Sequence, residues 1–119
     1  MELKKAIEGR HSSREFKFKK VKVADVFSVL EAALHAPMAG GLYATRLILV
    51  DEEEVKNDVA NASPGNEFLH DASHLIVVCS DVDQVSRSHG DNGSLYAAQQ
   101  AGAAIENMLL RIEDLGLSS

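Results

Sequence analysis

The chain has 119 residues, of which 45% are hydrophobic and 25% are charged, and its formal net charge is −6. This composition is typical of one globular domain, or part of one, and excludes a disordered tail. No apolar run approaches the roughly 20 residues of a membrane span, and the N-terminus lacks the apolar core of a secretory signal. A single cysteine, Cys79, excludes an intramolecular disulfide. Together these features predict a cytoplasmic protein with no membrane partner.

The basic groups are concentrated at the N-terminus. Residues 1–22 hold eight of the twelve lysines and arginines and only three acidic residues. Such a segment can hold one compact anion, or it can simply be a solvated basic face. The acidic remainder of the chain and its few aromatic residues argue against a nucleic-acid partner.

Apolar spacing predicts a short helix over residues 3–9, followed by a basic loop over residues 10–20 that leads into an extended piece. A second helix is predicted from residue 23 to about residue 36, because Pro37 disfavours helical geometry at the residue before it. Residues 38–44 are small and predict a loop, in which the two glycines are free to adopt positive φ.

The middle of the chain predicts alternating short elements. These are a buried strand over Leu47–Val50, an acidic helix over Glu52–Ala60, a turn over Ser63–Asn66, a second buried strand over Leu75–Cys79 and a polar loop over Asp81–Gly93. The second strand is apolar on both faces, and its Cys79 is interpreted as a small buried hydrophobe. The element order predicts an α+β or α/β fold.

The segment Ser94–Leu115 predicts a long helix with an unusually wide apolar surface. Its apolar and small residues form three stripes: Leu95, Ala98, Gly102, Ile105, Leu109 and Ile112; Ala97, Ala101, Ala104 and Met108; and Tyr96, Ala103 and Leu110. A surface helix needs only one stripe of about 100°. This helix is therefore either the central helix of a monomeric core or, as we predict, part of a homodimer interface.

The strongest candidates for binding residues form the sequence Arg10-His11-Ser12-Ser13-Arg14. Guanidinium groups bind phosphate oxygens two at a time, and a serine adds a hydroxyl and a backbone N–H. The usual dinucleotide, nucleoside triphosphate and zinc-protease motifs are absent. His70 and His74 are four residues apart and can be read as metal ligands, but no third strong ligand is near, so structural histidines are the preferred interpretation.

The order of these features resembles the nitroreductase family of FMN-dependent oxidoreductases. The matching segments are Ala6-Ile7, Arg10–Phe16, Ala32–Pro37, Leu47–Val50, Asp71–Cys79, Gly102–Leu110 and Leu115–Leu117. The resemblance covers nearly the whole chain. It implies an α+β fold with a central antiparallel or mixed sheet, surrounding helices and a long dimer-forming helix.

The resemblance also implies a cofactor, FMN, bound in grooves at the interface of a homodimer, with NAD(P)H as electron donor. Arg10 and Ser12 would contact the phosphate side, Arg14 the polar N1/O2 edge of the flavin, and His11 the phosphate or ribose. Further cofactor contacts are implied for a small set of residues: Pro37, Met38, Ala39, Gly41 and Asn66. No catalytic acid or base is implied, because the flavin carries the chemistry.

The chain departs from the family pattern in two respects. Gly41 and Tyr43 stand where the family has an asparagine and a glutamine. Family members also continue with further strands after the long helix, so residues 1–119 are expected to form one domain covering the N-terminal two thirds of the usual extent. The implied activity is transfer of electrons from NAD(P)H through FMN to a small acceptor such as a nitroaromatic or quinone. One alternative is a non-catalytic flavin-binding module. A less favoured alternative is a nucleic-acid binder that uses the basic residues 1–22.

Overall fold

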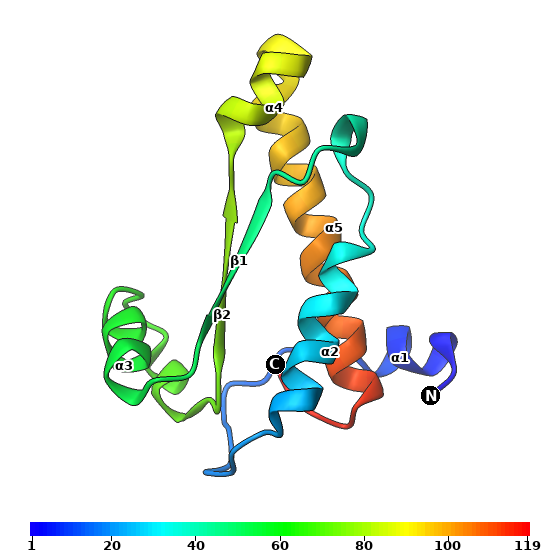
Figure 1. Ribbon diagram of the computed structural model, residues 1–119. Coiled ribbons are helices and arrows are strands. Elements are labelled where there is room, and N and C mark those ends of the chain that lie inside the picture. Colours follow the sequence, from blue (N-terminus) through cyan, green and yellow to red (C-terminus); the bar gives the residue numbers. More distant parts are fainter.

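A computed structural model describes residues 1–119, which form helices around one pair of strands (Figure 1). The elements, in chain order, are α1 (Leu3–Gly9), α2 (Val23–Leu34), β1 (Thr45–Val50), α3 (Glu53–Asn61), β2 (Leu75–Ser80), α4 (Val82–His89) and α5 (Gly93–Asp114). Three single 3₁₀ turns lie between them: η1 (Ala39–Gly41), η2 (Glu67–Asp71) and η3 (Gly90–Asn92). The predicted α+β class is confirmed.

The two strands form an antiparallel pair in which Leu47 lies opposite Val78 and Leu49 opposite Ile76. Side chains alternate between the faces of a strand, so these four lie on one face. Leu47, Ile76 and Val78 pack against the cluster that α2 and α5 build around Ala104 and Met108. The sheet is therefore covered on this inner face.

The outer face of the sheet corrects the prediction of two buried strands. Ile48 is 52% exposed, and Cys79 is also exposed. Only the end of the pair near Val50 and Leu75 is buried, under Ala72 and Phe16. An uninterrupted apolar run predicts burial on both faces, but this chain supplies helices for only one of them.

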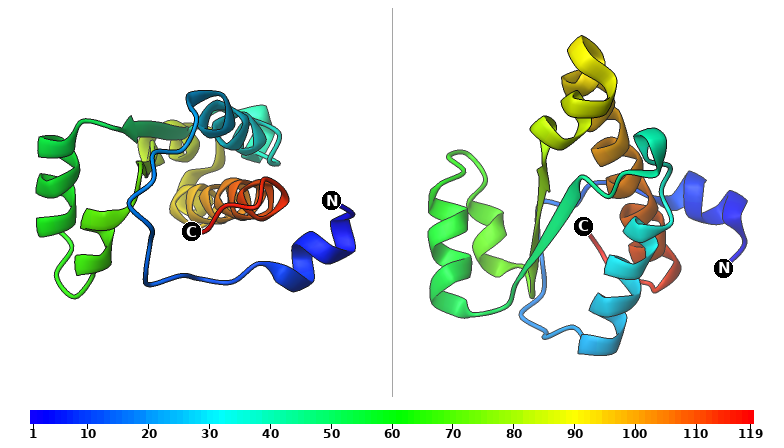
Figure 2. Two further views of the ribbon diagram at one scale, coloured as in Figure 1. Left: turned by 90° about the horizontal axis from the view of Figure 1, so that it is seen from below. Right: turned by 45° about the horizontal axis from the view of Figure 1, so that its top comes forward.

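Helix α5 is the centre of the molecule, and the views of Figures 1 and 2 agree that α1, α2 and α4 all lie against it. Its second predicted stripe faces inward, with Ala97, Ala104 and Met108 buried. The first stripe faces outward, where Leu95 is 55% exposed and Gly102 is exposed. No helix of the chain is long and apolar enough to cross a membrane.

Helix α4 corrects the prediction of a polar loop over residues 81–93. Asp81 caps this helix, because its Oδ1 accepts the backbone N–H of Gln84 at 3.1 Å. The helix has one fully buried side chain, Val85, which packs with Ala44 and Ala97. The segment looks polar because so few of its side chains face the core.

Candidate functional site

The basic segment after α1 is fixed at both ends. The backbone N–H of Arg10 donates to the Ala6 carbonyl, so the segment leaves the last turn of α1 directly. The N–H of Ser13 donates to the carbonyl of Ser119 at 2.7 Å, which ties the segment to the chain that follows α5. Figure 2 shows the segment running from α1 past the end of α5 toward the sheet. The two chain ends therefore define its path.

Arg14 is brought to the turn that contains Asn66. Its guanidinium carbon lies 5.3 Å above the centre of the Phe68 ring, a cation–π distance. Phe68 in turn packs against Phe16, with 6.3 Å between the ring centres. Asn66 lies just before η2, where its side chain donates to Ser63 Oγ at 2.8 Å. Two of the predicted site residues, far apart in sequence, thus share one region.

The other residues of the segment leave their polar groups accessible. His11 and Ser12 are exposed, and His11 Nδ1 lies 3.0 Å from the Gly9 carbonyl, which leaves Nε2 pointing elsewhere. Arg10 has one long ionic contact, 3.8 Å from its Nε to Glu106. Two guanidinium groups, a hydroxyl and an imidazole therefore lie on one short segment, although Arg10 and Arg14 contact different parts of the chain. This donor set suits a phosphate monoester next to a polar ring edge.

The second predicted group of residues is the loop after α2. Pro37, Met38 and Ala39 line a cleft of about 390 Å³, whose opposite wall is formed by residues of α4 and α5 including His89 and Tyr96. The His89 ring meets the Tyr96 ring edge-on, with centres 5.3 Å apart. Gly41 follows in η1 with a φ of 72° and does not line this cleft.

Within one chain the two groups lie apart. The loop after α2 packs beside the N-terminal half of α5, whereas Arg10 and Ser13 lie beside its C-terminal half and the chain end. Figure 1 shows η1 and α1 at opposite ends of that helix. The structure thus brings Arg14 to Phe68, two residues after Asn66, and leaves the loop after α2 in a different region.

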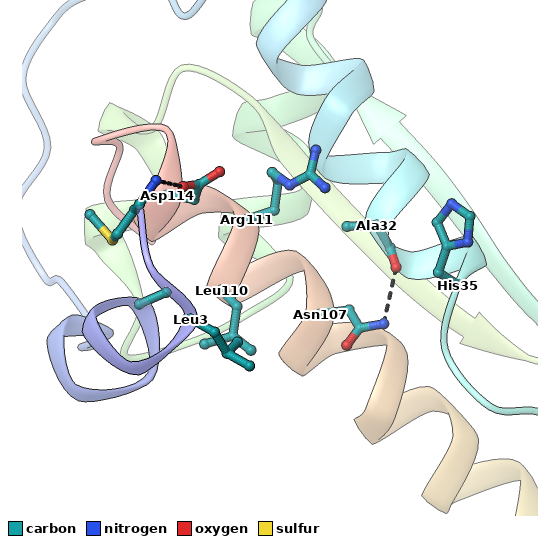
Figure 3. Close-up of a pocket in the computed structure, with 9 residues that line it drawn as sticks. Leu3, Ala32, His35, Asn107, Leu110, Arg111 and Asp114 are labelled. Atoms are coloured by element: carbon teal, nitrogen blue, oxygen red, sulfur yellow. Dashed lines mark hydrogen bonds and ion pairs between the residues drawn. The ribbon is translucent and has the colours of Figure 1, made fainter.

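Another cleft, of about 400 Å³, lies between α1, α2 and α5 (Figure 3). Three of its four polar side chains are already paired, the fourth being His35. Asn107 donates to the Ala32 carbonyl at 3.1 Å, Arg111 donates to Ser28 Oγ at 2.6 Å, and Asp114 pairs with the N-terminal ammonium at 2.9 Å. That ammonium, by its hydrogen bond and its charge, lowers the pKa of Asp114. No predicted site residue lines this cleft, so we interpret it as a gap between packed helices.

The two histidines near β2 have ordinary structural partners. His70 lies in η2 and its Nδ1 is 2.8 Å from Asn57 Oδ1. His74 Nδ1 is 2.8 Å from Ser73 Oγ. Desolvation, aided by the nearby Lys20 ammonium, lowers the pKa of His74 below its ordinary value of 6.5. No three metal-ligating side chains come together in the structure.

Sequence reasoning missed two residues that hold the predicted ones in place. Phe68 supports the Arg14 guanidinium, and Gln100 accepts the N–H of Ala39 at 3.0 Å. An isolated aromatic residue and a polar residue on an apolar helix were the only available signals. Neither indicates which distant segment it contacts.

Comparison with known proteins assigns the chain to a family. The family model described as the nitroreductase family matches residues 7–65 and 62–119. A protein of Archaeoglobus fulgidus is 32% identical over 115 residues, which cover 97% of this chain. It is named as an NADH dehydrogenase/NAD(P)H nitroreductase. The chain therefore belongs to the nitroreductase family, which confirms the resemblance.

Solved structures agree with this assignment. A structure from Clostridium acetobutylicum, with the given name of an NADH oxidase, has a TM-score of 0.78 and 30% identity over 92% of this chain. An FMN-dependent nitroreductase from Clostridium difficile has a TM-score of 0.80 and 26% identity over 95% of it. The chain spans only 63% of the Archaeoglobus protein and 63% and 61% of the two structures.

Proposed function

We propose that the chain is the N-terminal part of an FMN-dependent oxidoreductase that uses NAD(P)H to reduce a small electrophilic acceptor, such as a quinone or nitroaromatic. The observation that carries this proposal is the cluster of donors over residues 10–14 beside Asn66, in a chain of the nitroreductase family. Relatives named as NAD(P)H nitroreductase and FMN-dependent nitroreductase support the choice of donor and cofactor.

The residues present fit FMN in charge and hydrogen-bonding capacity. Arg10, His11 and Ser12 would hold the phosphate end, since they offer cationic and hydroxyl donors at one short segment. Arg14 and Asn66 would meet the polar edge of the ring. When bound, the flavin supplies two-electron transfer between NAD(P)H and the acceptor.

The loop of Pro37, Met38, Ala39 and Gly41 would complete the site from a second subunit. Within one chain this loop lies beside Gln100 of α5, whereas Arg10 lies beside Glu106 and Ser13 beside Ser119, which favours a contribution from a second subunit. The outward stripe of α5, with Leu95 and Gly102 exposed, supports a homodimer interface there. We therefore propose a homodimer with two equivalent sites, in which residues 1–119 belong to one domain.

The experiment is reconstitution of the chain, alone and within its full-length form, with excess FMN. We expect one FMN per protomer, identified by mass spectrometry after denaturation, and loss of the flavin's visible absorbance when NADH or NADPH is added under anaerobic conditions. Recovery of the absorbance on addition of a quinone completes the test. Preferential binding of FAD over FMN in parallel reconstitutions, or no flavin binding by the full-length form, would refute the proposal.

A second candidate is a flavin-binding module without turnover, which would use the same donors over residues 10–14. The same experiment separates it from the enzyme. A module binds FMN but its absorbance persists when NAD(P)H is added. Binding of nucleic acid by the basic segment would instead point to the third alternative, against which the net charge of −6 argues.

A further inference from the structure

Residues 37–45, which we name the glycine loop, are only partly fixed by their own hydrogen bonds. The N–H groups of Gly41 and Leu42 donate to the carbonyls of Met38 and Ala39, each at 3.1 Å, and the N–H of Ala44 donates to the Leu42 carbonyl at 2.9 Å. Gly40 and Gly41 adopt positive φ values of 59° and 72°, and glycine is the residue that loses most conformational freedom on folding. These local hydrogen bonds shape the turn, but the position of the loop against α5 depends on contacts from outside it.

Gln100 of α5 contacts the loop at three points. Its Oε1 accepts the N–H of Ala39 at 3.0 Å, while its Nε2 donates to the Leu42 carbonyl at 3.4 Å and lies 3.5 Å from Thr45 Oγ1. The residue is only 5% exposed. A buried amide that lost these partners would bear the cost of unsatisfied polar groups, so the contacts define one loop position.

His89 supports the other side of the loop. A Cβ added to Gly40 would lie 3.2 Å from His89 Cε1, so the imidazole ring occupies the space beside this glycine. Gln100 and His89 both line the cleft that Pro37 and Ala39 also line. The loop thus contacts Gln100 and lies close to His89, so these two side chains influence the shape of the cleft.

We propose that Gln100 is a positioning residue, which fixes the glycine loop and thereby the face that Pro37, Met38 and Ala39 present to the flavin. This inference rests on the proposed function. Gln100 itself is not assigned a contact with the flavin. It acts through the backbone of Ala39 and Leu42, whose polar groups it pairs.

The test replaces Gln100 with methionine, which has a similar length and volume but no amide. We expect amide hydrogen exchange at Ala39 to accelerate at least about tenfold, because its acceptor is lost. We expect the dissociation constant for FMN to rise by about tenfold in the full-length protein. The visible circular dichroism of bound FMN, which reports the ring's surroundings, should also change.

The matched control is Asn107→Leu on α5. Asn107 Nδ2 donates to the Ala32 carbonyl at 3.1 Å, outside the glycine loop and its cleft. This variant loses one amide hydrogen bond of the same helix through a polar-to-apolar substitution of similar size, so it reports a merely structural effect. We expect its Ala39 exchange, FMN affinity and flavin dichroism to match those of the wild type.

The outcomes separate the two proposals. Wild-type protein that binds FMN, together with a Gln100→Met variant of unchanged exchange and affinity, would overturn the inference alone. Wild-type protein that binds no FMN would overturn the proposed function and the positioning role with it. If Gln100→Met does not fold, Thr45→Val removes one contact while preserving shape, and we expect about threefold faster exchange at Ala39; no acceleration there would overturn the inference.

Discussion

Arg10 and Arg14 lie four residues apart but have different surroundings. Arg14 rests on the Phe68 ring beside Asn66, whereas Arg10 lies 3.8 Å from a carboxylate oxygen of Glu106. A cation at the ring edge of a flavin stabilises the negative charge that appears there on reduction. A cation at the phosphate meets the same charge in both redox states. The two arginines are therefore expected to affect different properties.

We predict that Arg14→Ala lowers the reduction potential of bound FMN by tens of millivolts. For a two-electron couple, about 30 mV corresponds to about 1.4 kcal/mol, which is the scale of one partly screened charge. Potentiometric titration of the reconstituted protein measures the shift. An unchanged potential would show that Arg14 does not lie at the ring edge.

Arg10→Ala is predicted to weaken FMN binding instead, by about 1.5–3 kcal/mol, through loss of a charge-assisted hydrogen bond. Titration of apoprotein with FMN measures this loss, and the potential of the remaining complex should stay near that of the wild type. A larger potential shift in Arg10→Ala than in Arg14→Ala would mean that the two roles are exchanged.

His74 predicts a pH dependence of stability. Burial and the Lys20 ammonium lower its pKa in the folded state, so the unfolded chain binds the proton more tightly. The stability contribution of the neutral ring is fully present above the unfolded pKa of 6.5, and it is lost as the pH falls through the lower folded pKa. Urea unfolding at several pH values should show this slope below 6.5, and His74→Gln should remove it. An equal slope in the variant would assign it to other groups.

At the scale of elements, α4 and α5 approach each other closely at Gly93. A Cβ added to Gly93 would lie 2.5 Å from the Cα of Ser86 and 2.6 Å from its backbone nitrogen. We predict that Gly93→Ala destabilises the fold by about 1–3 kcal/mol, because backbone atoms rather than a flexible side chain must move. Chemical denaturation measures the change.

Ser94→Ala is the control for this substitution, since Ser94 is the next residue of α5 and is exposed. Its stability should remain within about 0.5 kcal/mol of the wild type. Equal stability of Gly93→Ala and wild type would mean that α4 does not pack on α5 at this distance.

The sequence predicts those elements whose signal is local. The periodicity of α2 and α5 and the stop at Pro37 place both helices within about two residues of their observed ends. Helix α4 escapes prediction because a single buried valine, Val85, gives no periodicity to recognise. The Asp81 cap was a local signal for it, but capping residues also occur in turns.

The candidate site likewise contains some residues that the sequence identifies and some contacts that it does not. Residues 10–14 could be selected from the sequence because their chemistry lies in one short run. The contact of Gln100 with Ala39 spans 61 residues, and that of Phe68 with Arg14 joins two other distant segments. A single sequence carries no information on such pairs. Exposure of Cys79 was equally unpredictable, because it depends on which sheet face the chain covers.

At the scale of the whole molecule, the chain exposes more surface than a compact monomer should. Its accessible surface is 7627 Å², against about 6,300 Å² expected for a folded monomer of this length. Its radius of gyration is 15.2 Å, against about 13.5 Å expected. Large apolar side chains account for part of the excess, including Leu3, Ile7, Phe27, Leu34 and Leu95. We therefore expect this apolar surface to be buried against another polypeptide.

The outward stripe of α5 gives the sharpest test of what provides this cover. A charged residue at Ala104 would be uninformative, because Ala104 is 1% exposed within the chain's own core and its replacement would disrupt the fold. Leu95 and Ile105 are 55% and 38% exposed, so the protomer alone tolerates a charge there. In a dimer that buries them, an unpaired carboxylate is strongly unfavourable.

We therefore predict that the wild type sediments as a homodimer and that the double variant Leu95→Glu/Ile105→Glu raises the dimer dissociation constant at least about 100-fold. Val55→Glu is the matched control, because Val55 is a 42% exposed apolar residue on α3, away from α5. Its sedimentation should match that of the wild type, while circular dichroism confirms that all variants keep their helices. A monomeric wild type would contradict the homodimer, and a double variant that remains dimeric would place the interface elsewhere.

Because the proposed flavin site takes Pro37–Ala39 from the second subunit, the double variant should also lose FMN as it dissociates. Its FMN affinity should recover at protein concentrations that restore the dimer.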